Sequence, residues 1–190
     1  PDPHAEKQLD YWNDPWIPEA TYPFLIDFPV GLTNQAPVSV FQTGGPQYEW
    51  TDGNFERPAQ ENLVIYELLV RDFSEERNFQ FILDTLDYLS SLNITALQLM
   101  PINEFNGNDS WGYNPSFYFA VDKAYGTKNA FKALVDACHE RGISVILDMV
   151  LNHSDWPNPQ ILMWWQGNSP TLSNPFFNVE PPANGVDFFF

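Results

Sequence analysis

The sequence predicts an α/β fold with a parallel β-sheet, and three features of residues 61–154 support this prediction. Short apolar runs alternate with segments in which apolar residues recur at helical spacing. Proline, which is frequent on both sides of this region, occurs within it only at Pro101 and Pro115. The links from helix to strand are short and the loops after the strands are long, which predicts a functional face at the carboxyl ends of the strands.

The first strand and helix are predicted in residues 63–93. Residues 63–70 form an almost continuous apolar run, which is typical of a buried strand of a parallel sheet. Helical spacing follows at Phe79, Ile82, Leu83, Leu86 and Leu89. We expect Asn78 to cap the start of this helix and Asn93 to end it in the left-handed conformation.

Two more strands and a second helix are predicted downstream. Residues 96–100 form the second strand, which ends at Pro101. After a long loop, helical spacing recurs at Phe131, Leu134, Val135 and Cys138. Thr127 is the expected cap and Gly142 the expected stop of this helix, and residues 144–150 form the third strand.

The flanking segments are rich in proline, so they are not expected to form continuous helix or central sheet. Residues 1–60 contain strand-like pieces at 22–28 and 38–42, and we interpret them as the end of an accessory β-domain with a linker. The predicted organisation is therefore a flank at 1–60, three strand–helix units at 61–154 and a further segment at 155–190.

The composition excludes some classes of partner and favours another. A net charge of -17, from 25 acidic and 8 basic residues, argues against nucleic-acid binding. No stretch is long and apolar enough to span a membrane. Aromatic residues make up 16% of the chain and include seven Trp, which favours a carbohydrate ligand because aromatic faces pack on sugars, although core packing also uses aromatics. The single Cys138 forms no internal disulfide and is expected to be a packing residue.

A polar group of residues follows the third strand. Asp148 stands at its end, and Asn152 and His153 come just after it. A buried carboxylate is costly unless it is paired, and α/β enzymes place working groups at this edge. Asp148 could equally be a structural acid held by an Arg or by backbone amides, and His153 an ordinary loop histidine. Three histidines are too few for a zinc site, whereas an oxygen-rich calcium site at Asn152 or near Asp109 is chemically permitted.

The loop after the second strand, residues 104–115, is the other candidate. Its Gly, Asn and Asp residues permit tight turns, and Trp111 and Tyr113 flank Gly112. The loop is either a sugar-stacking platform with oxygen-rich neighbours or an ordinary loop anchored by two aromatic side chains.

Four motifs in this order resemble the α-amylase family of glycoside hydrolases: Val64-Ile65-Tyr66-Glu67, Trp111-Gly112-Tyr113-Asn114-Pro115, Tyr125-Gly126-Thr127 and Asp148-Met149-Val150-Leu151-Asn152-His153. They extend over residues 63–154, nearly half of the chain, and their joint order is far more specific than any one motif. The resemblance implies a partial (β/α)8 TIM barrel with strands one to three. It also implies that residues 155–190 begin the domain inserted after strand three.

The resemblance also implies roles for individual residues. Tyr113, with Trp111 beside it, would stack on the sugar at the cleavage subsite, and His153 would bind the hydroxymethyl group of that sugar. Asp148 would orient an Arg on strand four. Asn152 would hold the start of the inserted domain, in this family often through calcium.

The family retains configuration with an Asp nucleophile after strand four, a Glu acid/base after strand five and a stabilising Asp after strand seven. We find no such strands in this chain, so we expect it to contain no catalytic residue and to be inactive by itself. Asp72 and Glu104 also follow strands, but nothing marks them as a pair of carboxylates about 5 Å apart. The intact protein is expected to hydrolyse or transfer α-glucosidic bonds of starch-like substrates.

Two other functions remain open at this point. One is a non-catalytic starch- or α-glucan-binding protein on an amylase-like scaffold, and the other is a small metal-dependent enzyme that uses Asp148 and His153. A partial barrel would expose strand edges and an apolar inner face. We therefore expect self-association, or coverage of these strands by residues 1–60 and 155–190.

Overall fold

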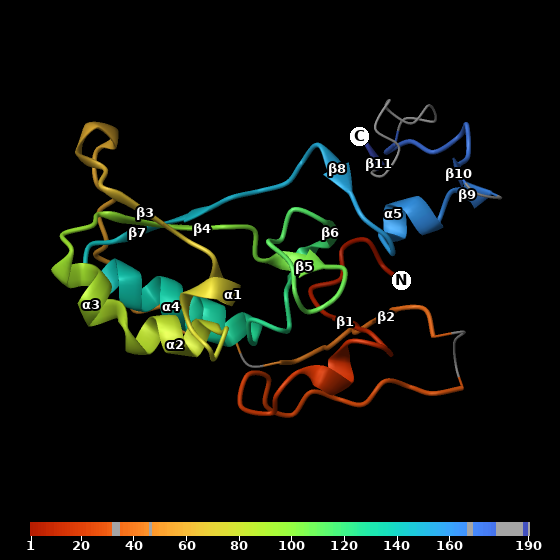
Figure 1. Ribbon diagram of the computed structural model, residues 1–190, viewed down its shortest axis with the longest axis horizontal. Coiled ribbons are helices and arrows are strands. Elements are labelled where there is room, and N and C mark those ends of the chain that lie inside the picture. The colour runs from red at the N-terminus through yellow and green to blue at the C-terminus, as the bar shows by residue number, and fades with distance from the viewer. Residues whose placement is uncertain (32–34, 46, 167–168, 178–187, 190) are drawn as a thin grey trace.

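The structure is a computed structural model that describes residues 1–31, 35–45, 47–166, 169–177 and 188–189. Its centre is a parallel sheet of three strands in the order β3, β4, β7 (Figure 1). These strands are β3 (Ile65–Leu68), β4 (Ala96–Leu99) and β7 (Ser144–Leu147). The predicted order and direction of the three strands are confirmed.

The strands are shorter at their carboxyl ends than the sequence predicted. The regular pairing of β4 stops at Leu99, before Pro101, which has no N–H to donate. On β7 the predicted strand up to residue 150 is too long, because the described strand ends at Leu147. The backbone N–H of Asp148 still donates to the carbonyl of Leu99 over 3.0 Å, so Asp148 is held at the end of the sheet.

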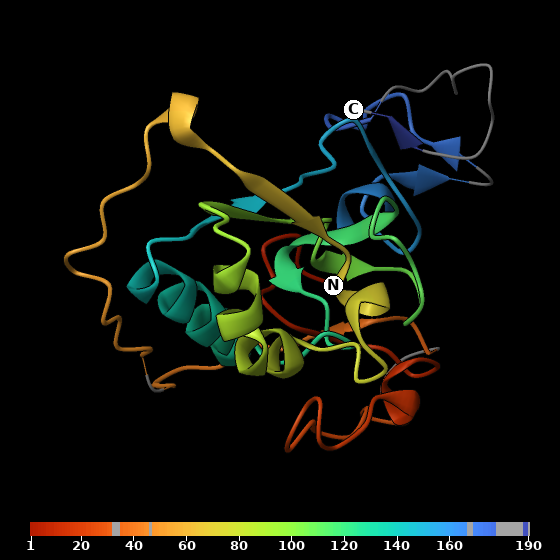
Figure 2. The same cartoon turned by 60° about the vertical axis from the view of Figure 1, so that its left-hand side comes forward.

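Helices cover one face of this sheet, as Figure 2 shows. They are α2 (Phe79–Asp84), α3 (Leu86–Ser91) and α4 (Lys128–Glu140). The prediction of one continuous helix over 79–89 was wrong, because Thr85 separates α2 from α3. The Thr85 hydroxyl donates to the carbonyls of Phe81 (2.8 Å) and Ile82 (3.1 Å), a type of contact that often bends helices. No helix in the described ranges is long and apolar enough to cross a membrane.

The predicted helix ends are confirmed. The side chains of Asn78 and Thr127 each accept a hydrogen bond from the backbone N–H three residues ahead, at 2.9 and 3.0 Å. Asn93 and Gly142 adopt positive φ angles of 56° and 72° where α3 and α4 end. A short helix α1 (Val70–Phe73), which the sequence did not predict, follows β3 directly.

The hydrophobic core lies between the sheet and the helices. Its fully buried side chains include Phe79, Leu89, Leu97, Leu99, Leu134 and Cys138. Cys138 is a packing residue as predicted, and burial raises the pKa of its thiol to about 12. Ile65 on β3 and Leu147 on β7 remain 49% and 40% exposed, so part of the sheet is not covered by these helices.

The segment between β4 and α4 was predicted as a loop, and this prediction was wrong. It contains β5 (Asn103–Phe105) and β6 (Pro115–Val121), which pair antiparallel with shifts in register. Phe117 and Ala120 on β6 are buried, which explains why this stretch forms a strand. The candidate platform loop is therefore the connection between two paired strands.

The N-terminal flank contains little regular structure. Strand β1 (Gln8–Leu9) pairs antiparallel with β2 (Val38–Ser39). The 3-10 helices are η1 (Asp14–Trp16) and η2 (Gln60–Asn62). The predicted strand at 22–28 is absent, because Pro23 and the positive φ of Phe24 interrupt it. Whether residues 1–60 end an accessory domain stays a prediction.

The segment around Thr51 crosses α4 and is attached to it by polar contacts. The Asp136 carboxylate accepts hydrogen bonds of 3.0 Å from the Thr51 N–H, the Thr51 hydroxyl and the Tyr48 hydroxyl. His139 Nδ1 lies 2.7 Å from Asp52 Oδ2. This part of the N-terminal flank therefore packs against the strand–helix units.

The tail after β7 contains several short elements. They are β8 (His153–Ser154), α5 (Pro159–Leu162), β9 (Trp165–Gln166), β10 (Ser169–Pro170) and β11 (Phe188–Phe189). Strand β11 pairs antiparallel with β8, and β9 pairs antiparallel with β10. That these elements begin an inserted domain stays a prediction.

We predict that Asp136→Ala lowers the free energy of unfolding by about 1–3 kcal/mol, because the hydrogen bonds that the buried Asp136 carboxylate accepts from Thr51 and Tyr48 are lost. Burial raises the pKa of Asp136, but the hydrogen bonds from Thr51 and Tyr48 outweigh it and hold the pKa below its ordinary value of 3.8. The stabilisation is therefore present above pH 3.8 and is lost as the pH falls through the lowered pKa. Urea denaturation at several pH values measures both effects.

Glu140→Gln is the matched control, because Glu140 accepts only an exposed hydrogen bond from Thr51. It should change the stability little. An Asp136→Ala variant as stable as the wild type at neutral pH would contradict the assigned role.

Candidate functional site

The candidate site lies where the three parallel strands end. The loops that follow β3, β4 and β7 leave the same edge of the sheet (Figure 1). Tyr113, from the connection between β5 and β6, meets Asp148 and His153 from the segment after β7. The structure thus brings together residues from the two candidate segments that the sequence identified separately.

Tyr113 is the centre of this group. Its hydroxyl donates a hydrogen bond of 2.5 Å to Oδ2 of Asp148, which is half-buried. Its backbone carbonyl lies 2.7 Å from Nε2 of His153. Because a carbonyl only accepts, this nitrogen of His153 carries the proton. Both partners thus fix the position of Tyr113, whose side chain is still 39% exposed.

The contact with Asp148 also raises the pKa of Tyr113. The hydrogen bond to the Asp148 carboxylate raises the pKa of Tyr113 to about 12, because the bond is lost when the phenol ionises. The phenol is protonated at neutral pH, as an unshifted phenol also is, and Tyr113 remains partly exposed. The sequence suggested an Arg or backbone amides as partners of a structural Asp148. The partner of Asp148 among the described residues is instead the phenol of Tyr113.

Trp111 lies two residues before Tyr113 and is 59% exposed. Gly112 between them has a φ of 88°, and a Cβ atom there would lie 2.3 Å from the carbonyl oxygen of Pro101. Only glycine therefore fits this close approach to the end of β4. The loop is held against the sheet at this point, with both aromatic side chains outside the core.

Arg71 anchors the same loop from the other side. It donates through Nη1 to Asp109 (3.1 Å) and through Nε and Nη2 to Asp72 (2.7 and 3.0 Å). The hydrogen bond from Arg71 lowers the pKa of Asp72. Asp72 is therefore the partner of a cation. Glu104 is buried and paired with Lys123, so neither acid presents itself as a nucleophile.

Two residues that sequence reasoning missed position His153. The hydroxyl of Tyr118 on β6 donates to the His153 carbonyl over 2.7 Å. The Ser154 hydroxyl donates to the carbonyl of Pro115 over 2.8 Å. No sequence signal could have identified Tyr118 and Ser154, since both are ordinary residues whose roles depend on a long-range contact.

Asn152 was the predicted calcium ligand, and its side chain is exposed. Within the described ranges, no three or more His, Cys, Asp or Glu side chains gather in a way that could hold a metal ion. Calcium binding stays a prediction, and no chemistry is assigned to a metal here.

Comparisons with known proteins address the family and the fold of this chain. Residues 71–162 match the family model of the alpha-amylase catalytic domain. A malto-oligosyltrehalose trehalohydrolase of Saccharolobus solfataricus is 42% identical over 108 residues, which are 57% of this chain and 19% of that protein. Alpha-amylase 3 of Dictyoglomus thermophilum is 33% identical over 146 residues, which are 72% of this chain and 28% of that protein.

Solved structures give the same result. A Salmonella typhimurium protein classed as an alpha amylase aligns with a TM-score of 0.68 and 31% identity, over 82% of this chain and 25% of that chain. An alpha-amylase from Lactobacillus plantarum aligns with a TM-score of 0.56 and 29% identity, over 67% of this chain and 30% of that chain. The resemblance and the partial barrel are therefore confirmed, and the chain spans less than a third of each relative.

We predict that the phenol of Tyr113 titrates with a midpoint of about 12, and that Asp148→Asn moves the midpoint towards the ordinary value of 10. The stabilisation from this contact is therefore present below pH 10 and is lost as the pH rises through about 12. Ultraviolet difference titration measures the midpoint, with Tyr113→Phe as the blank. Equal midpoints in the wild type and Asp148→Asn would contradict the assignment.

Proposed function

We propose that this chain, which carries the first strands of a catalytic barrel of the α-amylase family, supplies substrate contacts of a retaining glycoside hydrolase that acts on α-glucans. Tyr113, Trp111 and His153 bind the sugar, and Asp148 and Asn152 support the site. The observation that carries the proposal is the contact of Tyr113 with Asp148 and His153 at the carboxyl edge of the sheet.

The ring of Tyr113 is suited to stacking on a sugar. Aromatic rings pack against apolar surfaces, and the C–H face of a glucose unit is such a surface. The hydrogen bond to Asp148 fixes the ring before the ligand arrives, so little side-chain freedom is lost on binding. Trp111, two residues away and more exposed, can extend the contact to a neighbouring glucose unit.

His153 is placed to recognise the same sugar. Its imidazole lies next to the backbone of Tyr113, and the Tyr118 hydroxyl holds its carbonyl. A hydrogen bond between His153 and the hydroxymethyl group would complement stacking on Tyr113, because polar contacts set the orientation that an apolar contact leaves open.

We assign the bond-breaking groups to other parts of the whole protein. Retaining glycosidases need two carboxyl groups about 5–5.5 Å apart, one as nucleophile and one as acid/base. The acids around this site have other partners: Asp72 pairs with Arg71, and Asp148 accepts from Tyr113. The isolated chain would therefore bind an α-glucan without cleaving it, and the whole protein would hydrolyse or transfer α-glucosidic bonds.

We predict that Tyr113→Ala weakens binding of maltohexaose to this chain about tenfold, and that Tyr113→Phe weakens it much less, since the ring is kept. A contact with an aromatic face contributes about 0.5–1.5 kcal/mol, and a tenfold change in Kd corresponds to about 1.4 kcal/mol. Isothermal titration calorimetry measures the affinities.

Tyr88→Ala is the matched control, because Tyr88 is an exposed tyrosine on α3. It should leave the affinity unchanged. Equal binding by the wild type and Tyr113→Ala would contradict the proposal. Release of shorter sugars by the pure chain, abolished by Asp148→Asn, would show that the chain does contain a catalytic group.

A further inference from the structure

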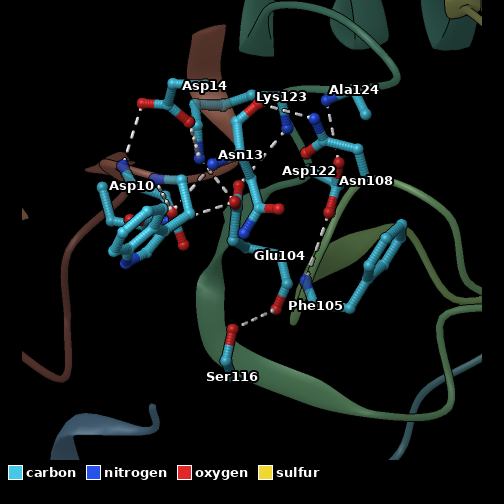
Figure 3. A network of polar contacts seen from close by, with 12 residues as sticks. Asp10, Asn13, Asp14, Glu104, Phe105, Asn108, Ser116, Asp122, Lys123 and Ala124 are labelled. Atoms are coloured by element: carbon cyan, nitrogen blue, oxygen red, sulfur yellow. Dashed lines mark hydrogen bonds and ion pairs between the residues drawn. The ribbon is translucent and has the colours of Figure 1, made fainter. Parts of the chain in front are cut away.

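A buried ion-pair network joins β5, the residues after β6 and the N-terminal flank (Figure 3). The strands β5 and β6 enter and leave the loop that carries Trp111 and Tyr113. Its centre is Lys123, which lies two residues after the end of β6 and is 2% exposed. The Lys123 ammonium contacts the carboxylate of Glu104 on β5 and lies 3.4 Å from Oδ1 of Asp14 on η1. Lysine is almost never so deeply buried unless it is paired.

The network connects the N-terminal flank with the strands β5 and β6. Gln8 on β1 donates through Nε2 to Oε1 of Glu104 over 2.7 Å. The Lys123 N–H donates to Oε2 of the same carboxylate over 3.3 Å. Glu104 is thus held by one residue of the N-terminal flank and by both nitrogens of Lys123, and Asp14 approaches Lys123 from the side of the flank.

The charges in this network depend on one another. Burial raises the pKa of the Asp14 and Glu104 carboxyls. Burial alone would lower the pKa of Lys123, but the surrounding carboxylates outweigh it and the pKa is raised. Lys123 therefore remains a cation, and its removal would leave buried carboxylates without a counter-charge.

The same network forms hydrogen bonds at both ends of the loop that carries Trp111 and Tyr113. Glu104 lies on the strand that enters the loop, and its carbonyl accepts a hydrogen bond of 3.1 Å from the hydroxyl of Ser116 on the strand that leaves it. The Phe105 N–H donates to Asp122, next to Lys123, over 3.2 Å. The loop that follows Phe105 therefore starts from a fixed base.

A second contact holds the loop from the side. Nδ2 of Asn108, three residues before Trp111, donates to the carbonyl of Asn13 over 2.7 Å. Asn13 immediately precedes Asp14, which faces Lys123. The base and the side of the loop are thus attached to the same short piece of the N-terminal flank, although 95 residues separate Asn13 from Asn108.

We propose that Lys123 and Asn108 are positioning residues that make residues 8–14 part of the framework of the sugar site. Through Glu104 and Asn13 they fix the loop, and thereby the orientation of Trp111 and Tyr113. Neither residue contacts the sugar. This inference rests on the proposed function, since the platform has its stated purpose only if it binds an α-glucan.

The test compares Asn108→Ala and Asp14→Asn with Lys128→Met. Lys128 pairs with Glu6 on the protein surface. The Lys128→Met substitution therefore removes a contact with the same N-terminal flank that does not involve the loop. One readout is the NMR resonance of the Trp111 indole N–H, identified by its absence in Trp111→Phe. The other readout is the affinity for maltohexaose.

Asn108→Ala and Asp14→Asn should shift or broaden the Trp111 resonance and weaken maltohexaose binding at least threefold. The unfolding temperature of each variant is measured to verify that it is folded under the conditions of the test. Lys128→Met should leave both readouts unchanged. Lys123→Met, where it folds, should perturb the Trp111 resonance most. Adding Glu104→Gln to this variant should move the resonance part of the way back to its wild-type position, because the unpaired charge is removed.

The inference is overturned when both Asn108→Ala and Asp14→Asn leave the Trp111 resonance as in the wild type, or when Lys128→Met shifts it equally. The resonance does not depend on sugar. Failure of the wild type to bind maltohexaose would therefore contradict the proposed function, while the resonance would still decide whether these residues position the loop.

Discussion

The parallel pairing of β4 with β3 on one side and β7 on the other is the constraint on which the candidate site depends. It brings the end of β4 next to two segments that are far apart in the sequence. The Asp148 N–H donates to the Leu99 carbonyl, and Gly112 packs against the carbonyl of Pro101. Because both segments are anchored at this one place, the hydroxyl of Tyr113 reaches the carboxylate of Asp148.

The sequence was sufficient to predict the sheet order, the helix caps and the two segments that form the site, because these features depend on local patterns and on the right-handed connection of parallel strands. It did not reveal β5 and β6, whose pairing is short and irregular in register. It also could not reveal the break at Thr85, or the pairing of Lys123 with Asp14. Such contacts join residues with ordinary local sequence and are determined only by the tertiary fold.

The distribution of charge explains part of this architecture. With 25 acidic and only 8 basic residues, the chain uses single cations to hold more than one carboxylate. Arg71 binds Asp72 and Asp109 at the surface, and Lys123 pairs with Glu104 and Asp14 in the interior. Both cations border the loop between β5 and β6. The ion pairs of Arg71 at the surface contribute little to the free energy of unfolding, whereas breaking the buried ion pairs of Lys123 would lower it strongly.

We propose that the loop after β5 and the segment after β7 form one sugar-binding surface around Tyr113. A crystal structure of this chain with maltohexaose tests it most directly. We expect a glucose ring stacked on the ring of Tyr113, within about 4 Å, with its hydroxymethyl group hydrogen-bonded to His153. Sugar bound elsewhere, for example at the exposed Trp16, with the ring of Tyr113 uncovered, would contradict it.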